Sequence, residues 1–171
     1  MPLIFLDFDD VICLNNPYGG YDVARAAYEV PEPDLWDKLF HRPSVRVLLA
    51  MLQEHKAQVV ITSSWLRFLD RDGIDTLLER TGLAPLKNAL HPQWDAPQNR
   101  HETRLSAIER WLAANHRGEA FIVLDDTLSG AALVDSHLDK DGRVVWCVEG
   151  VGLTSEHSEK VRSALMGQSE R

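Results

Sequence analysis

Five short apolar segments run through the chain and predict the strands of a sheet. They are LIFLDF near residue 5, QVVITS near residue 60, LAPLKNAL near residue 86, AFIVLDD near residue 123 and RVVWCV near residue 146. Within these segments apolar and polar residues do not alternate, which is typical of strands that are covered on both faces. We therefore expect a sheet that is buried between two layers.

Amphipathic segments lie between the apolar runs and predict helices. Each has apolar residues three or four positions apart, so that they form one stripe on a helix. The segments are residues 44–55, 72–82, 103–118 and 155–167, with Gly82, Gly118 and Thr154 or Ser155 at expected helix ends. Strands that alternate with helices predict parallel βαβ units. The expected fold is α/β, a three-layer Rossmann-like arrangement with a doubly wound parallel sheet.

The chain has no internal repeat and no low-complexity linker, so we expect residues 1–171 to form a single domain. The irregular part is residues 12–44, which are rich in Pro, Gly and aromatic residues. A stretch of this length is usually functional or contains small elements of its own. It is too short for a large cap domain, and we expect a flap in which Tyr18, Tyr21 and Trp36 pack against the core or stack on a substrate ring.

Polar residues follow three of the apolar runs. The first run ends in Asp7 and Asp9, the second in residues 62–64, and the fourth in Asp125 and Asp126. Helix capping would explain any one of these groups, but not two carboxylate clusters on different strands. Ligands bind outside the carboxyl ends of strands in open α/β sheets, and grouped carboxylates need a cation to remain ionised. The pattern predicts a Mg²⁺ site at this edge of the sheet.

These residue types also suit phosphoryl transfer. A carboxylate beside Mg²⁺ can attack phosphorus and form an aspartyl-phosphate. A second acid can protonate the leaving oxygen and later activate water. A hydroxyl and a basic side chain would hold the phosphoryl oxygens.

The strings LIFLDFDDV, VVITSSW and FIVLDD, in this order, resemble the first, second and fourth motifs of the haloacid dehalogenase (HAD) superfamily of phosphohydrolases. The resemblance implies that Asp7 is the nucleophile and that Asp9 is the general acid and base. It implies that Thr62 binds the transferred phosphoryl group, or Ser63 if the strand runs one residue further. Asp10 stands at a position that is often Gly in this superfamily.

The resemblance also implies the metal ligands. Asp7, Asp125 and the main-chain carbonyl of Asp9 would hold Mg²⁺, with Asp126 in support.

The third motif of the superfamily is a lone basic residue, and Lys87, Arg100 and Arg104 are the candidates. We favour Arg104, because it lies near the start of the helix that leads into FIVLDD, where the superfamily places this charge.

The strings TSSWLRF, RLSAIERWL, VLDD and GVGLT are similar to the small HAD domains of bacterial and phage RNA-repair proteins. This resemblance implies a phosphomonoester substrate at a nucleic-acid end or on a nucleotide. Four arginines could then line a path for a phosphate chain, namely Arg67, Arg71, Arg100 and Arg104.

Three alternatives remain at this point. The first is a phosphatase of small metabolites, and the second is a degenerate HAD module that serves as an interaction surface. The third is a receiver-like module that is phosphorylated on Asp. Receivers carry the phosphorylated Asp at the end of their third strand, and the third apolar segment here has no Asp.

Composition narrows the choice of partner and compartment. The net charge of −8 argues against general adhesion to nucleic acid or anionic membranes. Cys13 and Cys147 are too few for a disulfide framework, which favours a reducing compartment. The start of the chain has no basic region before its short apolar run, and no run is long enough to span a bilayer. We expect a cytoplasmic protein without membrane contact, whose oligomeric state the sequence leaves open.

Overall fold

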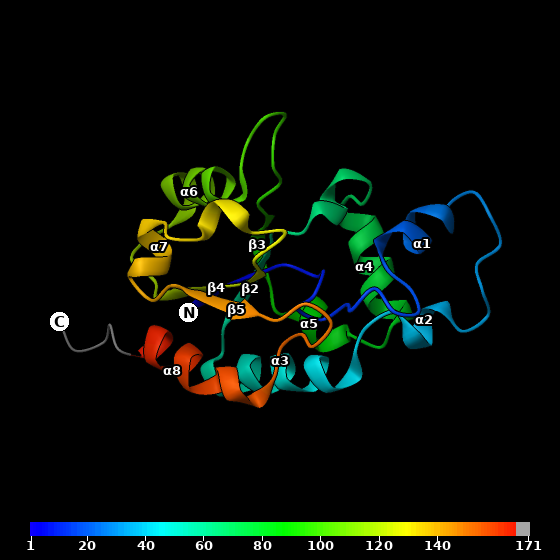
Figure 1. The fold of residues 1–171 in the computed structure, drawn as a ribbon, viewed down its shortest axis with the longest axis horizontal. Helices are drawn as coiled ribbons and strands as arrows, with labels where there is room; N and C mark the ends of the chain where they lie inside the picture. Colours follow the sequence, from blue (N-terminus) through cyan, green and yellow to red (C-terminus); the bar gives the residue numbers. More distant parts are fainter. Residues whose placement is uncertain (167–171) are drawn as a thin grey trace.

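The five strands pair in the order β3-β2-β1-β4-β5, and all the pairings are parallel. The structure is a computed structural model that describes residues 1–166 (Figure 1). The strands are β1 (Leu3–Leu6), β2 (Gln58–Ile61), β3 (Leu90–Asp95), β4 (Phe121–Asp126) and β5 (Val144–Cys147). This sheet, with helices on both of its faces, confirms the predicted doubly wound α/β fold.

The helices form a layer on each side of the sheet. Figure 1 shows α6 and α7 over one face and α3 and α8 over the other. The helices are α1 (Gly20–Arg25), α2 (Leu35–Lys38), α3 (Arg42–His55), α4 (Arg71–Arg80), α5 (Ala84–Asn88), α6 (Arg104–Asn115), α7 (His137–Lys140) and α8 (Ser158–Met166). Short 3₁₀ helices are η1 (Ser64–Arg67), η2 (Ala131–Leu133) and η3 (Ser155–His157).

The central strand β1 shows why its sequence is apolar throughout. Leu3 and Phe5 belong to the core beneath α6, where the Phe5 ring meets the Trp111 ring edge to face at 5.2 Å between centroids. Ile4 and Leu6 belong to the larger core on the opposite face. Successive side chains of a strand point to opposite faces, so a strand with helices on both faces needs apolar residues at every position. The result is a rigid base from which the following aspartates project.

The prediction for the third apolar segment was wrong. LAPLKNAL forms the helix α5, and the third strand begins only at Leu90. Pro85 lies in the first turn of α5, where a helix tolerates proline because the N–H groups there have no intrahelical partner. β3 is an edge strand that contains Pro92 and is only partly buried, so its sequence lacks an apolar run.

The other helices lie close to their predicted positions. Gly82 follows α4 with φ of 74°, a left-handed conformation that suits a residue without a β-carbon. α6 ends at Asn115, three residues before Gly118. Thr154 caps the 3₁₀ turn that leads into α8. Gly167, the last residue of the predicted final helix, lies outside the described residues.

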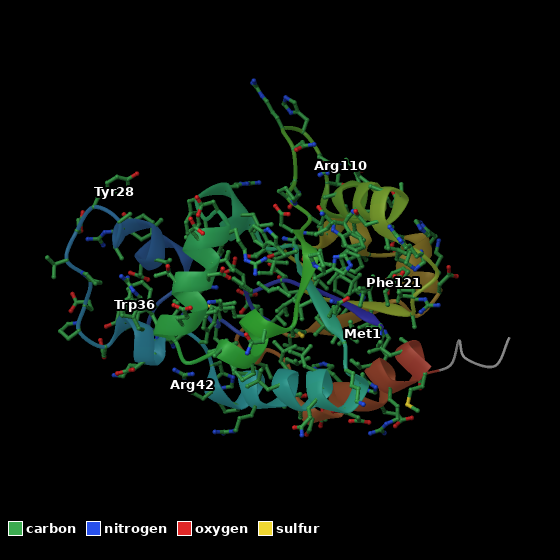
Figure 2. All side chains as sticks on the ribbon, turned by 180° about the vertical axis from the view of Figure 1, so that it is seen from behind. Met1, Tyr28, Trp36, Arg42, Arg110 and Phe121 are labelled. Carbon is green, nitrogen blue, oxygen red and sulfur yellow. The ribbon has the colours of Figure 1, made fainter. Side chains whose placement is uncertain are left out.

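The predicted flap between β1 and α3 contains two short helices, α1 and α2, and no large cap is present among the described residues. Trp36 is partly buried against the core, and the Arg80 guanidinium lies 5.1 Å above its ring. Tyr18 also packs there, and its hydroxyl donates to Asp34. Tyr21 is 74% exposed, so its predicted packing is wrong. Figure 2 shows the exposed Tyr28 at the far end of this segment.

The strand order bears on the receiver-like alternative. Receiver domains have the order 2-1-3-4-5, whereas here β1 lies between β2 and β4. The lack of Asp in the third apolar segment does not count against a receiver, because β3 ends in Asp95, but the topology does. Within residues 1–166 the helices are too short or too polar to cross a membrane.

Candidate active site

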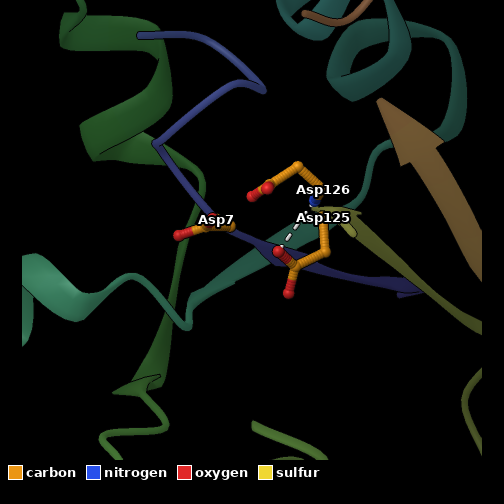
Figure 3. A group of neighbouring side chains, drawn as sticks. All are labelled: Asp7, Asp125 and Asp126. Atoms are coloured by element: carbon orange, nitrogen blue, oxygen red, sulfur yellow. Dashed lines mark hydrogen bonds between the residues drawn. The ribbon is translucent and has the colours of Figure 1, made fainter. Parts of the chain in front are cut away.

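Three aspartates meet at the carboxyl end of the sheet. Asp7 follows β1, and Asp125 and Asp126 end the neighbouring strand β4 (Figure 3). Each offers a carboxylate oxygen within 4.8 Å of the others. Asp7 and Asp125 are fully buried and Asp126 is 2% exposed. Parallel pairing of β1 with β4 thus brings the first and fourth motifs together.

Arg104 is the cation that faces this cluster. It is the first residue of α6 and only 2% exposed. Its Nη1 donates to Asp125 Oδ2 at 3.0 Å and lies 3.4 Å from Asp7 Oδ1. The same nitrogen donates to Thr62 Oγ1 at 3.3 Å, and Nε donates to Gln98 Oε1 at 3.3 Å. One guanidinium therefore joins β1, β2 and β4.

Thr62 and Ser63 have different surroundings although both are buried. The Thr62 hydroxyl accepts from Arg104 and lies beside the aspartates. The Ser63 hydroxyl accepts the main-chain N–H of Trp65 at 3.2 Å and so caps η1. This geometry favours Thr62 as the phosphoryl-binding hydroxyl.

The side chain of Asp9 lies outside the cluster of three carboxylates. Trp65 donates its indole N–H to both oxygens of Asp9, with Nε1–O distances of 3.3 and 3.2 Å. Asn15 Nδ2 donates to Asp9 Oδ1 at 3.1 Å. Neither donor follows a motif or a periodic pattern from which the sequence could have revealed it. The prediction that the main-chain carbonyl of Asp9 is a metal ligand stays a prediction.

A family model described as the HAD domain in Swiss Army Knife RNA repair proteins matches residues 3–158. The chain belongs to this HAD family. Comparison with curated proteins and with solved structures finds no match. Family membership identifies the chain as a HAD-type phosphohydrolase in general terms, and the roles of individual residues rest on the geometry of the site.

Burial makes the ionised form of the carboxylates in this HAD domain less favourable. Burial raises the pKa of Asp7 from 3.8 to about 6, although Arg104 acts to lower it. Burial also raises the pKa of Asp125 well above its ordinary value, again against the effect of Arg104. Burial raises the pKa of Asp9 above its ordinary value, although the hydrogen bonds from Asn15 and Trp65 act to lower it. One guanidinium does not offset the desolvation of this cluster.

The site fits a divalent cation. Within the described residues, both Asp7 oxygens and Asp126 Oδ1 are buried without a hydrogen-bond partner. The other Asp126 oxygen accepts the N–H groups of Leu128 and Ser129, which holds the carboxylate in place. Three carboxylates against one guanidinium leave two negative charges, which Mg²⁺ would balance with the oxygen ligands it prefers.

The other basic candidates lie elsewhere. Lys87 lies on α5 and pairs with Glu79. Arg100 is exposed in the connection between β3 and α6, which protrudes from the molecule in Figure 1. Of the three candidates, Arg104 is the one in contact with the aspartates.

Asp10 also serves a structural purpose. Its φ of 55° lies in the left-handed region, where Gly is favoured and Asp is tolerated better than most residues. Its Oδ1 accepts the N–H of Gly150 at 2.9 Å and so ties the end of β1 to the turn after β5.

Gly130 packs directly on the Asp125 carboxyl group. A β-carbon at this position would lie 2.8 Å from Asp125 Cγ and 3.0 Å from the carbonyl oxygen of Asp126. Gly130→Ala should therefore displace the Asp125 carboxyl group and destabilise the domain by about 1–3 kcal/mol. We expect weaker Mg²⁺ binding by calorimetry and a lower urea midpoint, with Ser129→Ala as the control. A Gly130→Ala variant that matches this control in both measurements would contradict the packing described here.

Proposed function

We propose that this HAD domain is a Mg²⁺-dependent phosphomonoesterase that forms an aspartyl-phosphate on Asp7 and acts on the phosphorylated ends of nucleic acids. The observation that carries the proposal is the Asp7 carboxylate, which is buried, has no hydrogen-bond donor among the described residues and lies 3.4 Å from Arg104. An anion in this position is available for bonding to phosphorus and to a metal.

The proposed reaction has two steps. An oxygen of Asp7 attacks phosphorus and the ester P–O bond breaks, while Asp9 gives its proton to the leaving oxygen. Water then attacks the phosphorus of the aspartyl-phosphate while Asp9 takes a proton from the water. The bond between phosphorus and the Asp7 oxygen breaks, which frees inorganic phosphate and restores the Asp7 carboxylate. Asp7, Asp125 and Asp126 would hold Mg²⁺, and the bound ion would supply positive charge that offsets the negative charge of the phosphoryl group.

Thr62 and Arg104 would bind the phosphoryl oxygens that face β2. Arg104 lies 3.4 Å from Asp7, and the Thr62 hydroxyl lies 3.3 Å from the same guanidinium nitrogen. Donors already in place before the reaction stabilise the charge of the transition state without reorganisation.

The surface beside the site supports a strand-like substrate. A small hollow is lined by Ser63, Arg67, Pro97 and Gln98. It lies next to the site, because Ser63 follows Thr62 and Gln98 accepts a hydrogen bond from Arg104. It shares Arg67 and Pro97 with an open groove of about 520 Å³. A terminal phosphate at Asp7 would leave the next nucleotides in this groove.

The groove contains aromatic and charged side chains. Trp94 lies beneath the Arg71 guanidinium at 5.7 Å, and Phe68 is 43% exposed. Asp70 and Asp95 also line it, so its positive and negative charges balance. We therefore expect base stacking to supply most of the binding, since stacking depends little on net charge.

The proposal is supported by the family, whose description names RNA repair proteins. It is also supported by the absence of a large cap among the described residues, because no second domain then blocks the approach of a long strand.

The test compares kcat/KM for a ten-nucleotide RNA with a 3′- or 5′-phosphate, the matching mononucleotide and 4-nitrophenyl phosphate, with Mg²⁺ and with chelator. We expect Mg²⁺-dependent release from all three and a preference of about tenfold for the RNA over the mononucleotide, as stacking of one base supplies. Phe68→Ala removes a partly exposed ring from the groove and should reduce this preference, whereas Tyr28→Ala, which removes an exposed ring at the far end of the flap, should preserve it.

Three outcomes would count against the proposal. Equal rates on RNA and mononucleotide would favour a small-metabolite phosphatase. Loss of the preference in both aromatic variants, or in neither, would show that the groove does not bind the RNA. No release from any substrate would indicate a degenerate HAD module.

A further inference from the structure

Trp65 is a buried tryptophan whose ring is held by two other aromatic side chains. The residue is 2% exposed and lies in η1, directly after the hydroxyl-bearing end of β2. Its ring packs edge to face on Phe8 with 5.1 Å between centroids and stacks on Phe40 at 5.9 Å. Aromatic contacts of this kind fix the plane of the ring.

The polar edge of this ring points at Asp9. The Nε1–H group is shared between the two carboxylate oxygens at 3.3 and 3.2 Å. Indole nitrogen can only donate, so this contact requires an oxygen that accepts. The second donor, Asn15 Nδ2, reaches Oδ1 alone at 3.1 Å. The fixed ring thus determines the direction of the whole carboxyl group.

The flap closes the remaining side of the indole edge. A β-carbon at Gly20, the first residue of α1, would lie 2.6 Å from Trp65 Nε1 and 2.8 Å from Cε2. The backbone of the flap therefore lies against the N–H group, and no other residue type fits at position 20 without moving the ring. This contact leaves Asp9 as the acceptor for the indole N–H.

We propose that Trp65 is a positioning residue, which aims the carboxyl group of Asp9 at the leaving-group oxygen through its indole N–H. The inference rests on the proposed function, because it assigns the proton transfer to Asp9. Donation of a proton needs the acid within hydrogen-bond reach of the leaving oxygen, and a carboxyl group that rotates freely spends less time in that position. Trp65 does not touch substrate in this account and acts through Asp9.

The leaving group provides the readout. A nucleoside alkoxide is a poor leaving group that needs a proton, whereas 4-nitrophenolate leaves readily without one. The value of kcat/KM covers the steps up to the first loss of leaving group, so it reports on Asp9 as an acid and not as the later base. If the carboxyl group of Asp9 is wrongly oriented, kcat/KM should fall more for nucleotides than for the aryl phosphate.

The experiment measures kcat/KM of Trp65→Phe on a nucleoside monophosphate and on 4-nitrophenyl phosphate. We expect a fall of about tenfold or more on the nucleotide and a much smaller fall on the aryl ester. Asp9→Asn should show the same selectivity with a larger effect. Trp111→Phe is the matched control, because it removes a buried indole N–H that donates to the Gln93 carbonyl on the other face of the sheet.

A second variant covers the case in which Trp65→Phe does not fold. Replacing Trp65 by 3-benzothienylalanine keeps the size of the ring and removes only the N–H group, and the same selectivity is expected. Equal losses on the two esters would overturn the role of Trp65 while leaving the proposed function intact if Asp9→Asn remains selective. Loss of selectivity in Asp9→Asn as well would overturn both the inference and the proton transfer on which it rests.

Discussion

Asp7→Asn should abolish phosphate release while leaving the fold intact. The substitution removes the proposed nucleophile but keeps the size and shape of the side chain. We expect the Mg²⁺-dependent rate on a nucleotide or aryl phosphate to fall by about three orders of magnitude or more, as happens when a covalent nucleophile is lost. Asp10→Asn is the matched control, because Asn tolerates the left-handed backbone at this position and can still accept from Gly150.

The same variant should change the stability of the metal-free protein in a defined direction. The pKa of Asp7 is raised to about 6 by burial, so the ionised carboxylate destabilises the folded state at neutral pH. Asp7→Asn removes that cost and should raise the urea midpoint in the presence of chelator at pH 7. The gain should shrink as the pH falls from 6 towards 4, because the wild-type carboxyl group then becomes protonated. A variant with more than a tenth of the wild-type activity, or one that is less stable than wild type without metal, would contradict this account.

Arg104→Met should destabilise the domain as well as inactivate it. The substitution leaves Asp7 and Asp125 buried beside each other without a compensating charge. Breaking a buried ion pair in this way costs about 3–5 kcal/mol. Arg110→Met is the control on the same helix, because the Arg110 pair with Glu102 is partly exposed, and such surface pairs contribute at most about 1 kcal/mol.

Urea unfolding with chelator and with Mg²⁺ measures the effect of Arg104→Met. Because Mg²⁺ also offsets the charge of the aspartates, it should stabilise this variant more than it stabilises wild type. In the Asp125→Asn background the same substitution should cost less, since one of the two carboxylates is then absent. Equal unfolding free energies for Arg104→Met and Arg110→Met would show that Arg104 does not hold the cluster together.

The sequence predicted the sheet edge that carries the site because parallel strands place their carboxyl ends together. The runs that end at Asp7, Thr62 and Asp125 are continuously apolar and buried on both faces, and such strands leave a clear pattern in the sequence. The third strand could not be found in this way. An edge strand has one neighbour and one open side, so β3 reads LHPQWD, without an apolar run, while the apolar run before it folds as α5.

Some residues of the site could be predicted from the sequence and others could not. The two carboxylate clusters could be paired from the sequence because each stands at a strand end, and Arg104 could be favoured because it begins the helix that precedes β4. Trp65 and Asn15 left no signal. An indole or amide donor follows no periodic pattern, and the Trp65 contact with Asp9 joins positions 56 residues apart. Such contacts depend on where the flap folds, which the irregular segment between β1 and α3 does not reveal.

The central claim is that the phosphoryl group passes through the carboxylate of Asp7. The most direct test is rapid quenching of the enzyme with a nucleotide or aryl phosphate and Mg²⁺, followed by borohydride reduction and mass spectrometry of the peptides. Borohydride converts an aspartyl-phosphate to homoserine, so the account predicts homoserine at position 7 and unmodified aspartate at positions 9, 10, 125 and 126. Homoserine at another aspartate, or turnover without homoserine at any position, would contradict it.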